Sequence, residues 1–173
     1  MSGAGAGVRH AVLMGVSGSG KTTVAMGAAQ ELHWEFGEAD LFHPEANVEK
    51  MRSGIPLDDD DRRPWLETLA QWIADHDAAG TPTVLACSAL RRSYRDLLRS
   101  SGADVVFVHL AGSKELISER MLARQGHFMP EKLLDSQFET LEQLQDDEQG
   151  VTLDLVHAPA ELVEQTVAYL RAD

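Results

Sequence analysis

Residues 15–22 of the chain, Gly15-Val16-Ser17-Gly18-Ser19-Gly20-Lys21-Thr22, decide its fold. The stretch fits the pattern G-x-x-x-x-G-K-[ST] at every fixed position, and it lies between an apolar run, His10–Met14, and a segment of helical spacing, Thr22–Leu32. Glycines let the backbone curl so that successive N–H groups point at one anion, and the start of the helix adds positive potential there. The pattern therefore predicts a phosphate-binding loop.

Different residues of this loop are expected to do different things. Lys21 reaches the β- and γ-phosphates of a nucleotide, and Thr22 offers its hydroxyl to Mg²⁺. A turn that only needs positive φ angles is the alternative, but it would not require Lys-Thr after the last glycine. The expected nucleotide contacts are Gly15, Ser17, Gly18, Ser19, Gly20, Lys21, Thr22 and Thr23.

Composition narrows the class of protein. The 173 residues predict one domain, and 28 acidic against 15 basic side chains give a net charge of −13. That balance disfavours a nucleic-acid partner, because phosphate backbones are bound by clustered Lys and Arg. The single Cys87 allows neither an intrachain disulfide nor a Cys-based zinc site. Without an apolar run of roughly 20 residues or an apolar signal-peptide core, we expect a cytoplasmic protein with no membrane partner.

Apolar runs of strand length alternate with segments of helical spacing, which predicts an α/β fold with a five-stranded parallel sheet flanked by helices. Strands are expected at His10–Met14, Trp34–Ala39, Thr83–Cys87, Val105–Leu110 and Leu153–Val156. Helices are expected at Thr22–Leu32, Pro64–Ala78, Ser93–Arg99, Lys114–Arg124, Glu131–Leu144 and Ala160–Leu170. Residues 1–173 form one domain in this interpretation, with a flexible start at 1–8, and the long loops near Gly54–Asp61 and Gln125–Pro130 bind or cover ligands.

Further motifs resemble the gluconokinase family from the first expected strand to near the end of the chain. They are Asp40-Leu41-Phe42-His43-Pro44, Glu49-Lys50-Met51, Gly54-Ile55-Pro56-Leu57, Asp60-Asp61-Arg62-Arg63-Pro64-Trp65-Leu66, Cys87-Ser88-Ala89-Leu90-Arg91-Arg92, Tyr94-Arg95-Asp96, Gly126-His127-Phe128-Met129 and Gln137-Phe138-Glu139-Thr140-Leu141-Glu142. Ala39 and Arg91-Arg92 depart from the family's usual glycine and lysines, which bears on substrate affinity rather than on the class of reaction.

The resemblance implies a P-loop NTPase fold like that of nucleoside monophosphate kinases and shikimate kinases, with a lid at about residues 120–131. It also implies a homodimer that uses ATP and Mg²⁺ to phosphorylate D-gluconate at the 6-hydroxyl, with a substrate-binding segment at about residues 40–63. A kinase for another small anionic acceptor such as shikimate is one alternative. A nucleotide-binding switch without an acceptor is the other.

Three polar residues follow predicted strands and are candidates for the acceptor site. Asp40 is the candidate base that accepts the acceptor's hydroxyl proton, or else a helix cap before Pro44. His43 either hydrogen-bonds a hydroxyl of the sugar acid or lies on the surface. Ser88 either contacts the acceptor or Mg²⁺ through water, or caps the next helix.

Two arginines are assigned to the substrate by the resemblance. Arg62 faces the substrate, where a planar guanidinium can bind a carboxylate through two hydrogen bonds. The acidic run Asp58–Asp61 before it is explained by the favourable interaction of negative charge with a helix start. Of Arg91 and Arg92, the second is chosen as the substrate contact, against the alternative of an exposed helix face.

The remaining candidates belong to the lid and the nucleotide-base site. The resemblance places Arg120 and Arg124 over the transferring phosphoryl group as catalytic residues, against the alternative of exposed helix charges. It places His127 at gluconate or at the docked lid, and Gln137 on a helix that supports the lid, with a possible substrate contact. Ala158 and Pro159 would hold adenine through backbone groups, although a proline at the first helical position has a structural explanation.

The net charge leads to one more expectation. Both substrates are anions, and a uniformly negative field would repel them. We therefore expect positive side chains to converge on one crevice, with the acidic surplus on outer helices. These side chains are Lys21, Arg62, Arg92, Arg120 and Arg124.

Overall fold

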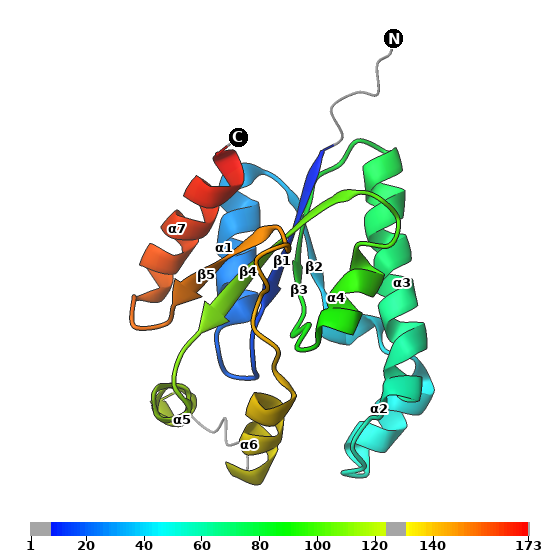
Figure 1. Ribbon diagram of the computed structural model, residues 1–173, viewed down its shortest axis with the longest axis vertical. Helices are drawn as coiled ribbons and strands as arrows, with labels where there is room; N and C mark the ends of the chain where they lie inside the picture. The colour runs from blue at the N-terminus through cyan, green and yellow to red at the C-terminus, as the bar shows by residue number, and fades with distance from the viewer. Residues whose placement is uncertain (1–7, 124–130, 173) are drawn as a thin grey trace.

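A parallel β-sheet lies between two layers of helices in the computed structural model, which describes residues 8–123 and 131–172 (Figure 1). Most of the expected lid, with Arg124 and His127, and nearly all of the start at 1–8 lie outside these residues. The part of the chain that is described has no helix long and apolar enough to cross a membrane.

The sheet has five strands in the order β2-β3-β1-β4-β5, and every neighbouring pair is parallel, as predicted. Parallel strands place all their carboxyl ends at one edge, where ligands of such sheets bind. The strands are β1 (Arg9–Met14), β2 (Glu35–Glu38), β3 (Thr83–Ala86), β4 (Asp104–Ala111) and β5 (Gly150–Asp154).

Helices cover both faces of the sheet and extend past its carboxyl edge (Figure 1). On one face lie α1 (Lys21–Leu32) and α7 (Pro159–Arg171), and on the other lie α3 (Asp59–Ala78) and α4 (Arg92–Leu98). A 3₁₀ turn, η1 (Ala39–Phe42), and α2 (Glu45–Arg52) follow β2. The helices α5 (Lys114–Ala123) and α6 (Glu131–Thr140) lie beyond the carboxyl edge, at the bottom of the figure.

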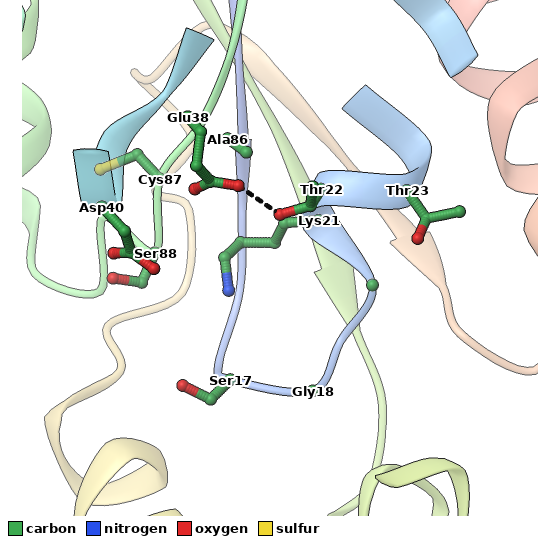
Figure 2. A pocket seen from close by; sticks show the side chains of 11 residues that line it. Ser17, Gly18, Lys21, Thr22, Thr23, Glu38, Asp40, Ala86, Cys87 and Ser88 are labelled. Atoms are coloured by element: carbon green, nitrogen blue, oxygen red, sulfur yellow. Dashed lines mark hydrogen bonds between the residues drawn. The ribbon is translucent and has the colours of Figure 1, made fainter. Parts of the chain in front are cut away.

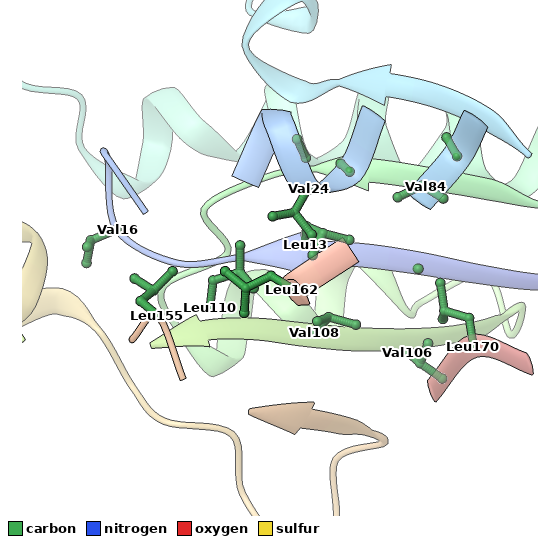
Figure 3. Packing of buried hydrophobic residues seen from close by; sticks show 14 of the residues in the cluster. Leu13, Val16, Val24, Val84, Val106, Val108, Leu110, Leu155, Leu162 and Leu170 are labelled. Carbon is green, nitrogen blue, oxygen red and sulfur yellow. The ribbon is translucent and has the colours of Figure 1, made fainter. Parts of the chain in front are cut away.

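The central strand β1 contributes to two hydrophobic cores because its side chains alternate between faces. Ala11 and Leu13 pack with α1 and α7, where Val24 and Leu162 are also buried (Figure 3). Val12 and Met14 pack in the second core, with α3 and α4. The phosphate-binding loop therefore begins at the end of a strand that is immobilised from both sides.

Three predicted boundaries were wrong. The helix expected at Pro64 begins at Asp59, because Asp58 and Asp61 form a capping box and Pro64 lies within the helix. The helix expected to reach Leu144 ends at Thr140, where the chain turns to pair Glu142 N–H with the Leu90 carbonyl.

The last strand begins three residues earlier and ends two residues earlier than predicted. β5 is an edge strand with a mixed burial pattern, so its sequence lacks the continuous apolar run of a central strand. It starts at Gly150, where a Cβ atom would lie 2.4 Å from the Phe107 carbonyl oxygen. The helix α2 was not predicted, because Asn47 is its only buried residue and leaves no apolar periodicity.

Candidate active site

A cleft of about 360 Å³ opens at the carboxyl edge of the sheet (Figure 2). It brings together the phosphate-binding loop, the end of β2, η1 and the end of β3. Its lining is Ser17, Gly18, Gly20, Lys21, Thr22, Thr23, Glu38, Asp40, Ala86, Cys87 and Ser88. Six of the predicted nucleotide contacts, together with Asp40 and Ser88, therefore line one cavity.

Backbone conformation explains the glycines of the loop. Gly15 has φ of +151°, and a Cβ atom there would lie 2.9 Å from the Leu110 carbonyl oxygen. Gly20 has φ of +88° and is the N-cap of α1, which no side chain caps among the described residues. The N–H groups at this helix start are thus left for an anion, which fits a phosphate group.

Lys21 projects from the first turn of α1 into the cleft, where its Nζ donates a hydrogen bond to the Val16 carbonyl at 3.2 Å (Figure 2). Burial lowers the pKa of its ammonium group, while the nearby Cys87, Asp40 and Glu38 oppose that shift. A positive charge with few protein partners is suited to binding phosphate oxygens.

Glu38 is a functional candidate that the sequence reading missed. It ends β2, and its Oε1 accepts a hydrogen bond of 2.5 Å from the Thr22 hydroxyl (Figure 2). The two groups present oxygen atoms, the ligands that Mg²⁺ prefers, and Mg²⁺ commonly takes its other ligands from phosphate and water. No cluster of three potential metal-ligating side chains occurs among residues 8–123 and 131–172.

Asp40 and Ser88 both lie in the cleft on the β3 side of Lys21 (Figure 2). The helix-cap alternatives for them are wrong, because Pro44 is the N-cap of α2 and Arg91 is the N-cap of α4. Trp65 Nε1 donates to the Ala39 carbonyl at 2.8 Å and so fixes the backbone beside Asp40. An exposed carboxylate on an anchored turn is well placed to receive a proton from a hydroxyl group.

Cys87 also lines the cleft, but its thiol is not a nucleophile there. Burial raises the pKa of the thiol to about 12. The thiol therefore remains protonated near neutral pH.

A second cavity, of about 280 Å³, lies on the other side of the phosphate-binding loop. It is mainly apolar, as a nucleotide base requires, and Pro159 lines it as predicted, whereas Ala158 is only the N-cap of α7. Arg120 lines the same cavity and donates to the His157 carbonyl at 3.3 Å. The structure therefore places Arg120 beside the expected base rather than in the cleft with Lys21.

His43 lies next to the cleft, packed against the first turns of α3. Its ring stacks on Trp65 at 4.2 Å between centroids, and its Nδ1 is 3.2 Å from Asn47 Nδ2. The pKa of His43 is lowered overall, mainly because burial disfavours the charged imidazole. The negative charge of Asp40 opposes this shift, and the positive charge of Arg62 adds to it. Both Asp40 and Arg62 are thus near enough to His43 to affect its pKa.

Arg62 belongs to a charged cluster at the start of α3. Its Nη1 donates to the Tyr94 hydroxyl at 3.0 Å, and that hydroxyl donates to Asp59 Oδ1 at 2.6 Å. Arg91 Nη1 lies 3.9 Å from Asp59 Oδ2. None of these residues is part of the cleft lining.

Arg92, the predicted substrate contact, lies outside the cleft lining and among acidic side chains. Its guanidinium pairs with Asp147 through hydrogen bonds of 2.7 and 3.0 Å and with Asp96 at 3.2 Å. Arg91 has extended backbone angles as the N-cap of α4, so it points in a different direction from Arg92 and reaches Asp59 instead. Of the five positive side chains expected to converge on one crevice, Lys21 lines the cleft, whereas Arg62 and Arg92 are not part of its lining. Arg120 lines the neighbouring cavity, and Arg124 lies outside the described residues.

Gln137 contacts the phosphate-binding loop. Its amide oxygen accepts the Ser17 backbone N–H at 2.6 Å, and its amide nitrogen donates to Ser17 Oγ at 2.9 Å. It was predicted to support the lid with a possible substrate contact. The described contact instead joins α6 to the nucleotide site.

Comparisons with known proteins agree with this arrangement. A family model described as "AAA domain" matches residues 11–144. A gluconokinase of Gluconobacter oxydans is 46% identical over 165 residues, covering 95% of this chain and 93% of that protein. The chain belongs to the gluconokinase family. A solved gluconokinase from Sinorhizobium meliloti is 45% identical with a TM-score of 0.85, covering 93% of this chain and 90% of that one. A solved sugar kinase from Janibacter is 52% identical with a TM-score of 0.87, and 94% of each chain is covered.

Proposed function

We propose that this member of the gluconokinase family transfers the γ-phosphoryl group of ATP to the 6-hydroxyl of D-gluconate, giving 6-phosphogluconate and ADP. The observation that carries the proposal is the cleft itself, in which Asp40 lies beside the phosphate-binding loop and Lys21. A nucleotide-binding switch, the alternative function, needs no binding site for an acceptor substrate. A kinase needs a proton acceptor and a phosphate clamp in one cavity, and we propose that Asp40 and the phosphate-binding loop with Lys21 have these roles.

The residues of the cleft suit an in-line transfer. The loop N–H groups and Lys21 bind the β- and γ-phosphates, and Asp40 accepts the hydroxyl proton as the acceptor oxygen bonds to the γ-phosphorus. The bond from the γ-phosphorus to the β,γ-bridging oxygen breaks, and ADP leaves. In a loose transition state the acceptor needs orientation more than full deprotonation, so a carboxylate that accepts a hydrogen bond from the hydroxyl is sufficient.

Mg²⁺ is part of this proposal. Thr22 and Glu38 would hold it with the phosphate oxygens, and when bound it neutralises charge that develops on the transferring group. Arg124 and Arg120 are proposed to act from the lid side. A homodimer in the cytoplasm completes the proposal, and light scattering during size-exclusion chromatography would test the dimer.

A coupled assay of ADP release with gluconate, other sugar acids, shikimate and no acceptor tests the function. We expect release with gluconate, a loss of about 1,000-fold in kcat for Lys21→Ala, and a loss of about 100-fold for Asp40→Asn with ATP binding retained. Asp60→Asn is the matched control, because Asp60 is an exposed carboxylate on α3. Release only with shikimate, or tight ATP binding without release for any acceptor, would overturn the proposal.

A further inference from the structure

Ala89, which follows Ser88 just after β3, has an unusual backbone conformation. Its φ of +44° lies in the left-handed region, which a Cβ atom disfavours by roughly 10-fold in population. In residues 8–123 and 131–172, His33 is the one other non-glycine residue with a positive φ. His33 is the C-cap of α1, where that conformation is common, whereas Ala89 ends no helix. Contacts with the rest of the protein must therefore hold Ala89 in place.

Arg95 on α4 makes these contacts. Its Nη1 donates to the carbonyls of Ala89 and Leu90, at 2.9 and 3.3 Å. Its Nε and Nη2 donate to the two carboxylate oxygens of Glu148, and the side chains of both residues are completely buried. A guanidinium can bind a carboxylate and two carbonyls at once because its donors form a rigid planar fork, and a lysine ammonium group has no such geometry. The ion pair thus fixes the orientation of the donors that hold the turn.

Ser88 is the residue of this turn that lines the cleft, together with Asp40 (Figure 2). Its hydroxyl makes no hydrogen bond to any described residue, so its position depends on the backbone. That backbone is held at two points, because the Ser88 carbonyl accepts the Gly15 N–H at 3.2 Å and Arg95 holds the next two carbonyls. If Ala89 changed to a negative φ, the peptide group between Ser88 and Ala89 would rotate, and Ser88 would lose its place in the cleft.

We propose that Arg95, held by Glu148, is a positioning residue for phosphoryl transfer: it keeps Ala89 in the left-handed conformation and so places the Ser88 hydroxyl for contact with the acceptor. This inference rests on the proposed function and deepens it. Arg95 does not line the cleft and is not itself a catalytic residue. An ion pair that only stabilised the fold would not need to hold the carbonyls of a strained turn beside the cleft.

Arg95→Lys tests this role, because it keeps the positive charge opposite Glu148 but removes the planar fork. We expect kcat/KM for gluconate to fall about 10-fold, with the dissociation constant for ATP, measured by calorimetry, within about 2-fold of that of the unmodified protein. The matched control is Arg99→Lys, because Arg99 also contacts Glu148, at 3.1 Å, but within the described chain holds no carbonyl of the turn. It should leave kcat/KM within about 2-fold.

Ala89→Gly should restore activity that Arg95→Lys loses. Glycine adopts the left-handed conformation without the Cβ penalty, so in the Arg95→Lys background this change should raise kcat/KM for gluconate about 5-fold. His33→Gly is the matched control, because it removes the same penalty at the end of α1, outside the cleft lining, and it should give no recovery in that background. Equal recovery by His33→Gly would show that only stability had been restored, and would overturn the proposal.

Two further variants keep the test independent of how well Arg95→Lys folds. Glu148→Asp shortens the carboxylate that orients Arg95 while keeping both charges, so it should lower kcat/KM for gluconate about 5-fold, and Ala89→Gly should again recover it. Ser88→Ala should itself lower kcat/KM about 10-fold, and with Ser88 replaced, Arg95→Lys should lower it by less than about 2-fold more, because Arg95 acts through Ser88.

The outcomes separate the positioning role from the function itself. If Arg95→Lys and Glu148→Asp lower only the urea concentration at half-unfolding, or if the losses from Arg95→Lys and Ser88→Ala are fully additive, the positioning role is overturned while the function remains intact. Failure of the unmodified protein to phosphorylate gluconate would instead overturn the proposed function and, with it, this inference.

Discussion

The side-chain amide of Gln137 pairs with Ser17 through two hydrogen bonds, of 2.6 Å to the backbone N–H and 2.9 Å from Nε2 to the hydroxyl oxygen. These residues are 120 positions apart, so the pair ties α6 to the loop that binds phosphate. An amide oxygen therefore occupies a backbone donor of the nucleotide site.

A negative charge at position 137 should weaken nucleotide binding. Gln137→Glu keeps the size of the side chain but places a carboxylate against the triphosphate, and we expect the dissociation constant for ATP to rise about 10-fold. Ser136→Glu, an exposed neighbour on α6, should have an effect below about 2-fold and is the control. Isothermal titration calorimetry would measure both, and equal affinity in Gln137→Glu and the unmodified protein would contradict the assignment of α6 to the nucleotide site.

Glu38 should affect the requirement for Mg²⁺. Glu38→Gln removes the charge beside the Thr22 hydroxyl, so the Mg²⁺ concentration at half-maximal nucleotide binding should increase about 10-fold. The midpoint would be measured by titrating Mg²⁺ into the protein with a fluorescent ATP analogue and following the fluorescence of the bound nucleotide. Glu35→Gln, an exposed residue at the other end of β2, should leave the midpoint where it is, and the same midpoint in Glu38→Gln would show that Glu38 has no part in metal binding.

A buried ion pair holds the turn between Ser88, which lines the cleft, and Arg91 at the start of α4. Arg95 donates to both carboxylate oxygens of Glu148, at 2.7 and 3.0 Å, and to the Ala89 carbonyl at 2.9 Å. Burial disfavours the charge on Glu148, but the hydrogen bonds from Arg95 and from Gln145 N–H outweigh it and lower the pKa of Glu148 to about 2.

Loss of this pair should destabilise the protein near neutral pH. Glu148→Gln leaves the Arg95 charge uncompensated and should cost about 3 kcal/mol in the free energy of unfolding at pH 7. The contribution of Glu148 is complete above its unfolded pKa of about 4.5 and is lost as pH falls through about 2. Urea unfolding at pH 7 and at pH 3 would show a smaller difference at pH 3. Asp146→Asn, at an exposed position, is the control. If Glu148→Gln lowers the free energy of unfolding equally at pH 7 and pH 3, the carboxylate of Glu148 does not have the low pKa described here.

His109 predicts a second pH dependence. Burial, and then the positive Arg95, lower the pKa of His109 to about 4, and its Nδ1 has no hydrogen-bond partner among the described residues. The unfolded chain binds a proton below about pH 6.5 that the folded chain does not, so stability falls from pH 6.5 toward 4, by about 3 kcal/mol for this residue. His109→Asn should reduce that slope and His33→Asn, at an exposed position, should not. A slope unchanged in His109→Asn would count against a neutral buried imidazole.

Features that depend on consecutive residues could be predicted from the sequence, whereas contacts between residues far apart in the chain could not. The loop Gly15–Thr22 was predicted correctly because every requirement is within eight consecutive residues. The different partners of Arg91 and Arg92 could not be predicted, because they depend on the backbone angles of the N-cap and on the positions of Asp59 and Asp147. Helical spacing cannot supply such information, since it assigns a face to a residue but not the charges opposite that face.

Glu38 was missed for the same kind of reason. Its partner Thr22 lies on another element, and only the pairing of β2 with β3, and of β3 with β1, brings the end of β2 beside the loop. A carboxylate two residues before Asp40 was the available signal. Acidic residues at strand ends near a predicted phosphate loop are candidates for the metal site on that ground.

The most direct measurement of the central claim is identification of the product by ³¹P and ¹³C nuclear magnetic resonance after incubation with ATP, Mg²⁺ and D-gluconate. We predict one phosphate monoester, with phosphorus coupled to C6 of gluconate, and one equivalent of ADP. Phosphate on any other carbon, or inorganic phosphate as the only product, would contradict the account.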